Sequence, residues 1–327
     1  MQKEFGGYLP LELPDGKEYI DRYAGVQVLR LNCGRNAIAA ALLGVKAKKV
    51  YIPHYNCDVV RETVEKYEIP FEKYLLDDKM QPSGVTLDEQ EWLLYPNYFG
   101  ALTESEAEAI ADRFGRVIFD NTQAFFAPPV RRAGCFNVYS PRKFIGLIDG
   151  AYLIWDNDVR IDDSIYRQDV SWERGAFLLK SQELGTNAAY QDNMQSKTQL
   201  GDEILRMSVL TRKMLSGADY DRIRCARRRN LSVLKKHLDP VNQLPFSVDG
   251  DLMNYPLYIE NDALRAKLVS QKIYVPQWWK YVIPLTPADS VENRLSRWLL
   301  PLPIDQRYSE ADMETLAEMV LNAYESC

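Results

Sequence analysis

The chain has 327 residues, a length that predicts two structural units or one large unit with a smaller one appended. Its 46% apolar and 26% charged residues are ordinary for a globular protein and exclude the disordered and membrane-spanning classes. Forty basic and 46 acidic residues give a net charge of -6, which argues against nucleic acid as the main partner.

The side chains available for chemistry are limited. Histidine occurs only at His54 and His237, which is too few for a multi-histidine metal site and leaves little for a histidine base. The N-terminal residues lack the apolar core of a signal peptide, and no stretch approaches the ~18 apolar residues of a membrane span. The five cysteines are scattered without metal-site spacing, so we expect a reducing cytoplasm and no membrane partner.

The first half of the chain alternates between two kinds of pattern. Short apolar runs predict strands at 50–53, 71–76, 92–100, 116–120, 134–140 and 150–155. Helical spacing and end signals predict helices at 34–43, 58–69 and 104–115. This alternation indicates βαβ units, and therefore an α/β fold with a mainly parallel sheet between helices. Catalytic groups on such sheets lie at the carboxyl ends of the strands.

The pattern changes near residue 200. Long helices are predicted at 203–217 and 220–238, followed by strands at 255–260 and 272–276 and helices at 262–271 and 310–324. We therefore predict a large domain over residues 1–220 and a small α+β domain over 221–327. The run Arg227-Arg228-Arg229 lies inside a predicted helix and is most simply a solvated face.

A first candidate site is the turn Cys33-Gly34-Arg35-Asn36 before the first helix. Free backbone amides at a helix start, together with the helix dipole, bind phosphate-sized anions, and glycine allows their close approach. Ordinary helix capping explains the same residues equally well.

A second candidate is Asp120, which ends a predicted strand and is followed by Asn121-Thr122-Gln123. A carboxylate at a strand end can hold a proton on a ring nitrogen through a charge-assisted hydrogen bond. The alternative is a helix N-cap, since Asp-x-x-Gln is close to a capping box.

A third candidate is Ser140-Pro141-Arg142-Lys143. A serine three residues before a lysine places a hydroxyl for a phosphate and an amine for an aldehyde on the same small molecule, and lysine forms Schiff bases when its pKa is lowered. The alternative is an exposed loop lysine.

A fourth candidate is His54-Tyr55-Asn56-Cys57, which follows a predicted strand. A flat side chain here can cover one face of a bound ring. Tyr55 can equally be a core or interface residue, and His54 a structural histidine.

In this order, the four segments resemble the DegT/DnrJ/EryC1/StrS sugar aminotransferases, which are fold-type I pyridoxal phosphate enzymes. NCGRNAIAAALLG resembles the family's helix start, VYIPHYNCDVV its Val-x-x-Pro segment, VIFDNTQAF its Asp-x-Ala-Gln run, and YSPRKFIGLIDGAYL its lysine segment. A weaker similarity continues to the C-terminal LPLPIDQRYSEADM. The resemblance implies a large sheet domain, a smaller C-terminal domain, a homodimer and pyridoxal 5'-phosphate as cofactor.

The resemblance also implies residue roles. Lys143 would bond covalently to the cofactor and later move the substrate proton, while Asp120 would pair with the ring nitrogen. Gln123 would lie near the phenolic oxygen of the ring.

The same resemblance assigns the phosphate to the amides of Gly34 and Arg35 and to the Ser140 hydroxyl, and it counts Asn36 among the cofactor-binding residues. Two departures from the family bear on this site. Arg35 replaces a threonine or serine, and its guanidinium is expected to meet the phosphate directly. Cys57 stands where many members carry an aromatic ring, so Tyr55 or another residue must stack on the cofactor.

The implied reaction is amino transfer from an amino acid, commonly glutamate in this family, to a keto sugar linked to a nucleotide. The family's Gly-x-Asn-x-Arg-Met loop, which often completes the phosphate site of a neighbouring subunit, is reduced here to Arg206-Met207. A lyase, a dehydratase or a small-molecule aminotransferase on the same fold stays open. So do a cofactor-binding relative without turnover and an α/β protein without a cofactor.

Overall fold

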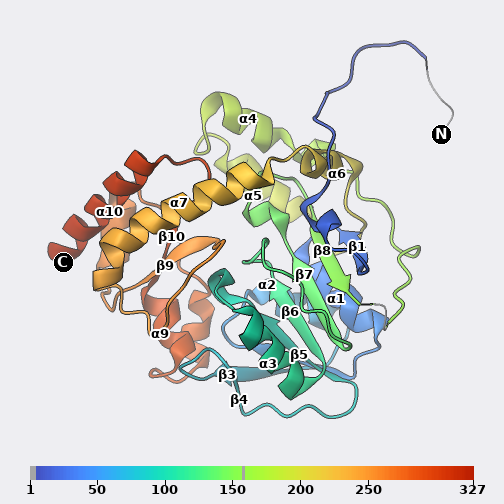
Figure 1. Ribbon diagram of the computed structural model, residues 1–327, viewed down its shortest axis with the longest axis horizontal. Coiled ribbons are helices and arrows are strands. Elements are labelled where there is room, and N and C mark those ends of the chain that lie inside the picture. Colours follow the sequence, from blue (N-terminus) through green and yellow to red (C-terminus); the bar gives the residue numbers. More distant parts are fainter. Residues whose placement is uncertain (1–4, 157–158) are drawn as a thin grey trace.

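The computed structural model describes residues 5–156 and 159–327. Its centre is an eight-stranded sheet with the order β1-β8-β7-β6-β5-β2-β3-β4 (Figure 1). The strands are β1 (Gln27–Leu31), β2 (Lys49–Pro53), β3 (Phe71–Leu76), β4 (Pro82–Ser83), β5 (Glu91–Pro96), β6 (Val117–Asn121), β7 (Cys135–Tyr139) and β8 (Ala151–Trp155).

Five neighbouring strands, β3, β2, β5, β6 and β7, run parallel, while β8 and β4 run against their neighbours and β1 pairs antiparallel with β8. The prediction of a mainly parallel sheet is therefore confirmed. Strand β1 was missing from the predicted set, and the strand predicted at 92–100 ends at Pro96, where the short helix Tyr98–Gly100 follows.

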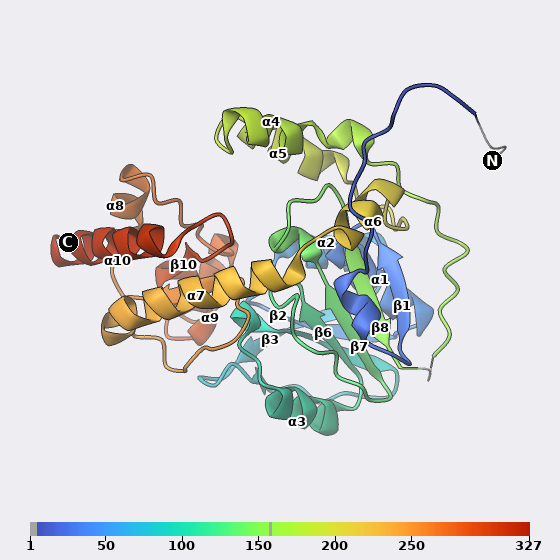
Figure 2. The same cartoon turned by 45° about the horizontal axis from the view of Figure 1, so that its top comes forward.

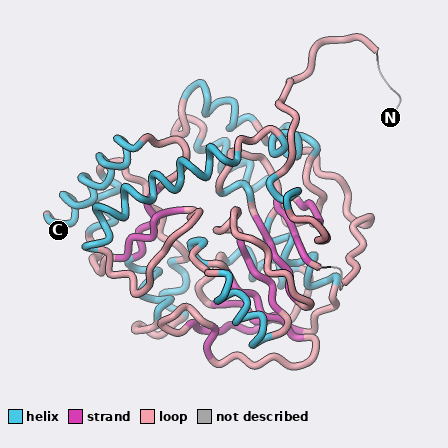
Figure 3. Tube along the Cα trace, viewed as in Figure 1, coloured by secondary structure: helices cyan, strands magenta, loops and turns pink. Residues whose placement is uncertain are grey.

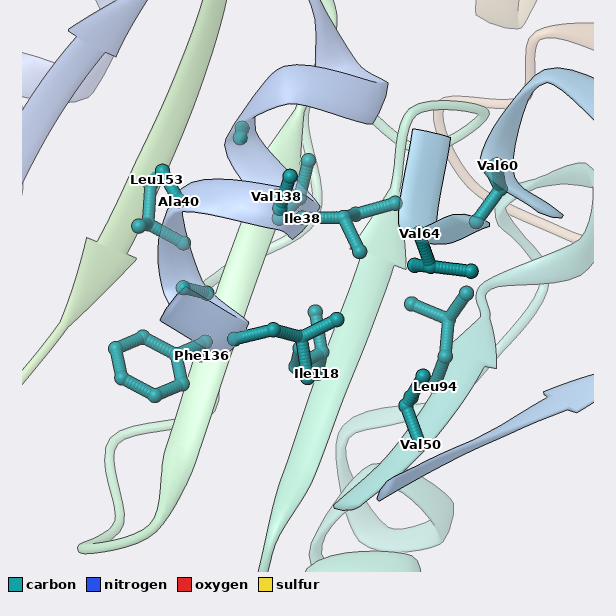
Figure 4. Close-up of a cluster of buried hydrophobic side chains, with 14 of the residues drawn as sticks. Ile38, Ala40, Val50, Val60, Val64, Leu94, Ile118, Phe136, Val138 and Leu153 are labelled. Atoms are coloured by element: carbon teal, nitrogen blue, oxygen red, sulfur yellow. The ribbon is translucent and has the colours of Figure 1, made fainter. Parts of the chain in front are cut away.

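Helices cover both faces of the sheet because successive strand residues point to opposite sides. Helix α1 (Gly34–Gly44) packs its alanine-rich face on one side, where Figure 4 shows Ile38 and Ala40 near Val138, Ile118 and Leu153. Helix α2 (Asp58–Lys66) joins this core. Helix α3 (Glu104–Phe114) belongs to a different core that contains Phe119, the neighbour of Ile118 on β6.

A third core surrounds the two-stranded antiparallel sheet of β9 (Asn254–Tyr258) and β10 (Leu299–Pro303). It is packed by α8 (Leu264–Ser270) and α10 (Glu310–Glu325), while α9 (Val291–Trp298) contributes to the core that contains α3.

Helix α7 (Tyr220–Leu238) connects the two parts of the molecule. Its first turn, with Tyr220 and Ile223, packs in a core with Phe125 and Phe144, whereas Leu234 lies in the core of β9 and β10. Figure 2 shows α7 running from α6 beside the large sheet to the region of α10. The small unit is thereby held at a defined position beside the sheet.

The segment between β8 and α7 carries α4 (Ala176–Leu184), α5 (Tyr190–Gln199) and α6 (Val209–Ser216). The predicted helix at 203–217 was too long, because residues before Ser208 run as extended chain beside β1 and Ser208 then caps α6 through the amide of Thr211. The predicted strand at 272–276 was wrong, since this segment is loop (Figure 3). Within the described ranges, no helix has both the length and the apolar character needed to cross a bilayer.

Candidate active site

Lys143 lies at the end of a short 3-10 helix (Pro141–Lys143) that directly follows β7. Its Nζ donates a hydrogen bond to Thr122 Oγ1 at 3.1 Å. The side chain keeps accessible surface, yet the surrounding protein lowers the pKa of the Lys143 amine through burial, against the opposing attraction of Asp120 and Cys57. Both properties fit an amine in a deep, open cleft, and they argue against an ordinary loop lysine.

Asp120 reaches the same place from β6. Parallel pairing sets Asp120 opposite Val138 of β7, so the carboxyl ends of the two strands meet at one edge of the sheet. The carboxylate is 6% exposed, and its Oδ1 accepts the Thr122 amide at 3.0 Å. No helix begins after Asp120, so the N-cap interpretation does not apply. The charge of Asp120 acts on the Lys143 amine instead.

The N-terminus of α1 adjoins these residues. A Cβ placed on Gly34 would come within 2.9 Å of Thr122 Cγ2, so the helix start lies directly against the residue that bonds Lys143. No side chain caps α1, and no acceptor in the described chain takes the amides of Gly34 and Arg35. These amides are therefore free to bind an anion.

The side chains of Arg35 and Asn36 point elsewhere. The Arg35 guanidinium donates to the Gly201 carbonyl and lies 3.4 Å from the Asp202 carboxylate, so it already has partners within the chain, and its contact with a phosphate stays a prediction. Asn36 is fully buried and donates to Asn32 Oδ1 at 2.9 Å and to the Glu203 carbonyl at 2.7 Å. Of these two residues, Arg35 offers the cleft a free backbone amide.

Ser140 and Gln123 differ in how their side chains are held. Ser140 is buried at the start of the Lys143 helix, and its hydroxyl has no hydrogen-bond partner among the described residues. Gln123 is also buried, and its Oε1 accepts the Phe99 amide at 2.9 Å, which fixes the orientation of its side-chain amide.

Tyr55 and Cys57 differ in solvent exposure. Tyr55 has no accessible surface and packs in the core, with its ring 4.5 Å from Trp279 and 5.6 Å from Tyr98. The structure therefore supports the alternative interpretation of Tyr55 as a core residue. Cys57 is exposed at the N-terminus of α2 and interacts electrostatically with Lys143, so it does belong to the cleft.

The small unit approaches the cleft from two directions. Tyr281 donates to the Asn56 carbonyl, beside Cys57. Gln306 donates to the Phe144 carbonyl at 2.9 Å, next to Lys143. The cleft thus lies between the sheet edge and the small unit.

A cavity of about 580 Å³ opens at Lys143 and is enclosed by α4, α5, α7 and the loop after β10. Sequence reasoning missed four of its cationic residues: Arg142, Lys197, Arg227 and Arg307.

Arg227 corrects the expectation of a solvated arginine run. It is 2% exposed, donates to the Met253 carbonyl at 2.9 Å and stacks its guanidinium 4.5 Å from the Phe144 ring. Burial lowers the pKa of Arg227 to about 10, so it stays charged at neutral pH. Only Arg228 and Arg229 of the run reach the surface, which a helical periodicity with one inward position could have indicated.

No protein-family model matches this sequence, and no curated protein matches it. Solved structures do match. A DegT DnrJ EryC1 StrS aminotransferase from Brucella abortus is 17% identical, with a TM-score of 0.62 over 93% of this chain and 87% of that chain. The aminotransferase TlmJ from Streptoalloteichus hindustanus is 15% identical, with a TM-score of 0.64 over 92% and 86%. DesI, analysed in the presence of its TDP-sugar product, is 16% identical, with a TM-score of 0.58 over 93% and 82%.

The chain has the fold of the sugar aminotransferases. The likeness extends over about nine-tenths of the chain, so the sugar aminotransferase fold includes both the large sheet and the small unit. It confirms the predicted α/β class, fold-type I, and the fold implied by the resemblance of the motifs. Identities of 15–17% establish this fold, while the chemistry has to be argued from the residues of the cleft.

Proposed function

We propose that this protein is a pyridoxal phosphate-dependent aminotransferase that moves an amino group from an amino acid, glutamate in the first instance, to a keto sugar carried on a nucleotide. The observation that carries this proposal is the convergence of Lys143, Asp120 and the uncapped start of α1 around Thr122. Three segments from distant parts of the chain meet there, with an amine, a carboxylate and free amides.

The chemistry of these groups fits the cofactor. An amine of lowered pKa that keeps accessible surface suits an aldehyde, a strand-end carboxylate suits a protonated ring nitrogen, and free helix amides with the unpartnered Ser140 hydroxyl suit a phosphate. When bound, pyridoxal phosphate supplies an aldehyde that condenses with amines and a ring that accepts electrons from the substrate carbon.

The residues of the chain then have separate tasks. Lys143 Nζ, whose pKa is lowered by burial, acts as nucleophile and afterwards takes and returns the proton at the substrate carbon. Thr122 Oγ1 orients Nζ at 3.1 Å. Asp120 holds a proton at the ring nitrogen with Oδ2, because Oδ1 is already engaged by the Thr122 amide.

The acceptor class is inferred from two considerations. DesI was analysed with a TDP-sugar product, and it shares this fold over most of both chains. The cavity beside Lys143 is large and carries several cations, which suits a substrate with phosphate groups. A nucleotide-linked keto sugar meets both requirements.

Another chemistry on the same fold remains the second candidate. A 3-amino-5-hydroxybenzoic acid synthase matches this chain with a TM-score of 0.57 at 13% identity. The fold by itself therefore does not fix a sugar as the substrate. A lyase, a dehydratase or a small-molecule aminotransferase uses the same lysine, and a relative without turnover keeps the bound cofactor. Reaction with glutamate would separate the aminotransferase from both the lyase and the relative without turnover.

The assembly and its location are part of the proposal. Large apolar side chains are exposed on and beside α4 and α5, which stand out from the sheet in Figure 2. They are Trp172, Leu179, Leu184, Tyr190 and Met194. Burying such a patch favours self-association, and we propose a homodimer in the cytoplasm with domains over 1–220 and 221–327.

The deciding experiment is a half-reaction with purified protein. Pyridoxal phosphate is added, and a visible absorption band is expected; glutamate alone should then convert the bound cofactor to its amino form and release 2-oxoglutarate. A band without conversion by any amino acid would refute the aminotransferase and leave a lyase, a dehydratase or an inert binder. Conversion by glutamate followed by turnover with keto acids but with no nucleotide-linked keto sugar would refute the sugar acceptor.

A further inference from the structure

The cavity beside Lys143 has an excess of positive charge. Five cationic side chains line it, and among the described lining residues the acidic side chain is that of Asp305. Asp305 is already paired with Arg307 through contacts of 2.7 and 2.9 Å. The lining therefore carries more positive than negative charge, and this imbalance favours an anionic ligand.

The positive charge of Arg142 has no ionic partner within the described chain. Its Nε is buried without a hydrogen-bond partner, and no carboxylate of the described chain lies within ion-pair distance of it. Asp149 attracts it electrostatically, but the Asp149 oxygens bind the Ser208 amide and hydroxyl at 2.7 Å and the Thr211 hydroxyl. A partly desolvated guanidinium in this state is unfavourable unless a ligand pairs with it.

The surroundings of Arg142 lead to the start of α1. Arg142 is close enough to Cys33, the N-cap residue of α1, for an electrostatic interaction, and Lys197 of α5 is likewise close to Arg142. Arg142 also lies between Ser140 and Lys143 in the chain and lines the same cavity as Lys143. Arg35, the other arginine near this helix start, is engaged with Gly201 and Asp202.

We propose that Arg142, assisted by Lys197, binds the cofactor phosphate within a single chain, together with the α1 amides and Ser140. This inference rests on the proposed function, because it names further ligands at the same site. It also explains how the phosphate is neutralised in a chain that lacks the partner loop expected from the motif comparison. An arginine presents a fork of N–H donors that matches phosphate oxygens, and Lys197 of α5 adds a second charge in the same cavity.

The test compares two vitamers that differ in the phosphate. Pyridoxal 5'-phosphate and pyridoxal are titrated into the apoprotein, and covalent binding is followed by absorbance and by borohydride trapping of Lys143. The wild-type protein should prefer the phosphorylated vitamer. Arg142→Ala should weaken pyridoxal phosphate binding by about ten- to a hundredfold while leaving pyridoxal binding nearly unchanged, because a charge-assisted contact to the phosphate is lost.

Three further variants sharpen the result. Lys197→Ala should lose part of the same preference, and Arg142→Lys should restore part of what Arg142→Ala loses, because a charge remains. Arg132→Ala is the matched control, since Arg132 is exposed and pairs with Asp112 of α3. Inorganic phosphate should compete with pyridoxal phosphate in the wild-type protein and compete less in Arg142→Ala.

Each failure has a distinct meaning. If the wild-type protein traps neither vitamer at Lys143, the proposed function falls and the inference with it. If the wild-type protein prefers the phosphorylated vitamer and Arg142→Ala keeps that preference with a normal melting temperature, the inference alone is overturned. If Arg35→Ala loses the preference and Arg142→Ala keeps it, the phosphate is bound by Arg35, and the inference about Arg142 is overturned.

Discussion

Replacement of Asp120 by asparagine tests the mechanism most directly. The carboxylate is 6% exposed and uses Oδ1 for the Thr122 amide at 3.0 Å, which an asparagine oxygen can also accept. Oδ2 has no partner in the described chain, and an amide at that position no longer favours a proton on a ring nitrogen. A charge-assisted hydrogen bond contributes about 1.5–3 kcal/mol, so the variant should lose about ten- to a hundredfold or more in kcat and keep its cofactor.

The same substitution should shift the pH dependence in a known direction. The Asp120 charge raises the pKa of the Lys143 amine, in opposition to burial. Without that charge the pKa of Lys143 falls further, so the neutral amine persists to lower pH. The rise of the cofactor-capture rate with pH should therefore begin at a lower pH than in the wild-type protein.

The assay is stopped-flow absorbance over a pH series, with glutamate conversion measured on the loaded protein. Unchanged kcat in Asp120→Asn would remove Asp120 from the mechanism. A capture profile that shifts to higher pH would contradict the electrostatic argument, whatever the effect on turnover. The Asp112→Asn variant, on the exposed face of α3, is the control for an aspartate remote from the cleft.

Three further predictions concern the groups around Lys143. Lys143→Ala should fold with a near-normal melting temperature and lose the visible absorption band; a retained band would mean that another lysine holds the cofactor. Thr122→Val removes the 3.1 Å hydrogen bond to Nζ while keeping the side-chain shape, and kcat should fall by up to about tenfold with little change in cofactor affinity; an unchanged kcat would contradict the orienting role. Gly34→Val pushes against Thr122 Cγ2, 2.9 Å from the position of a Cβ, and should weaken cofactor binding at least several-fold by equilibrium titration; normal affinity would contradict the close approach at the helix start.

The sequence by itself determined the alternating elements and the placement of the two groups that define the site. Hydrophobic periodicity is a local property, so the helix at 220–238 and the strand at 71–76 were found at their true bounds. Asp120 and Lys143 could be expected to meet because each follows a strand of one parallel sheet. The predicted roles of the site residues and the boundary at residue 220 stay predictions.

The tertiary structure alone decided which side chains enter the cleft. The ring of Tyr55 packs in the core against Trp279, which is more than two hundred residues away in the chain. The Arg35 side chain is held by contacts with Gly201 and Asp202. Arg142 was passed over for the lysine beside it. Such contacts join residues that are distant in sequence, and the periodicity of a short segment contains no information about which partner lies opposite. Burial and charge pairing therefore had to come from the folded chain.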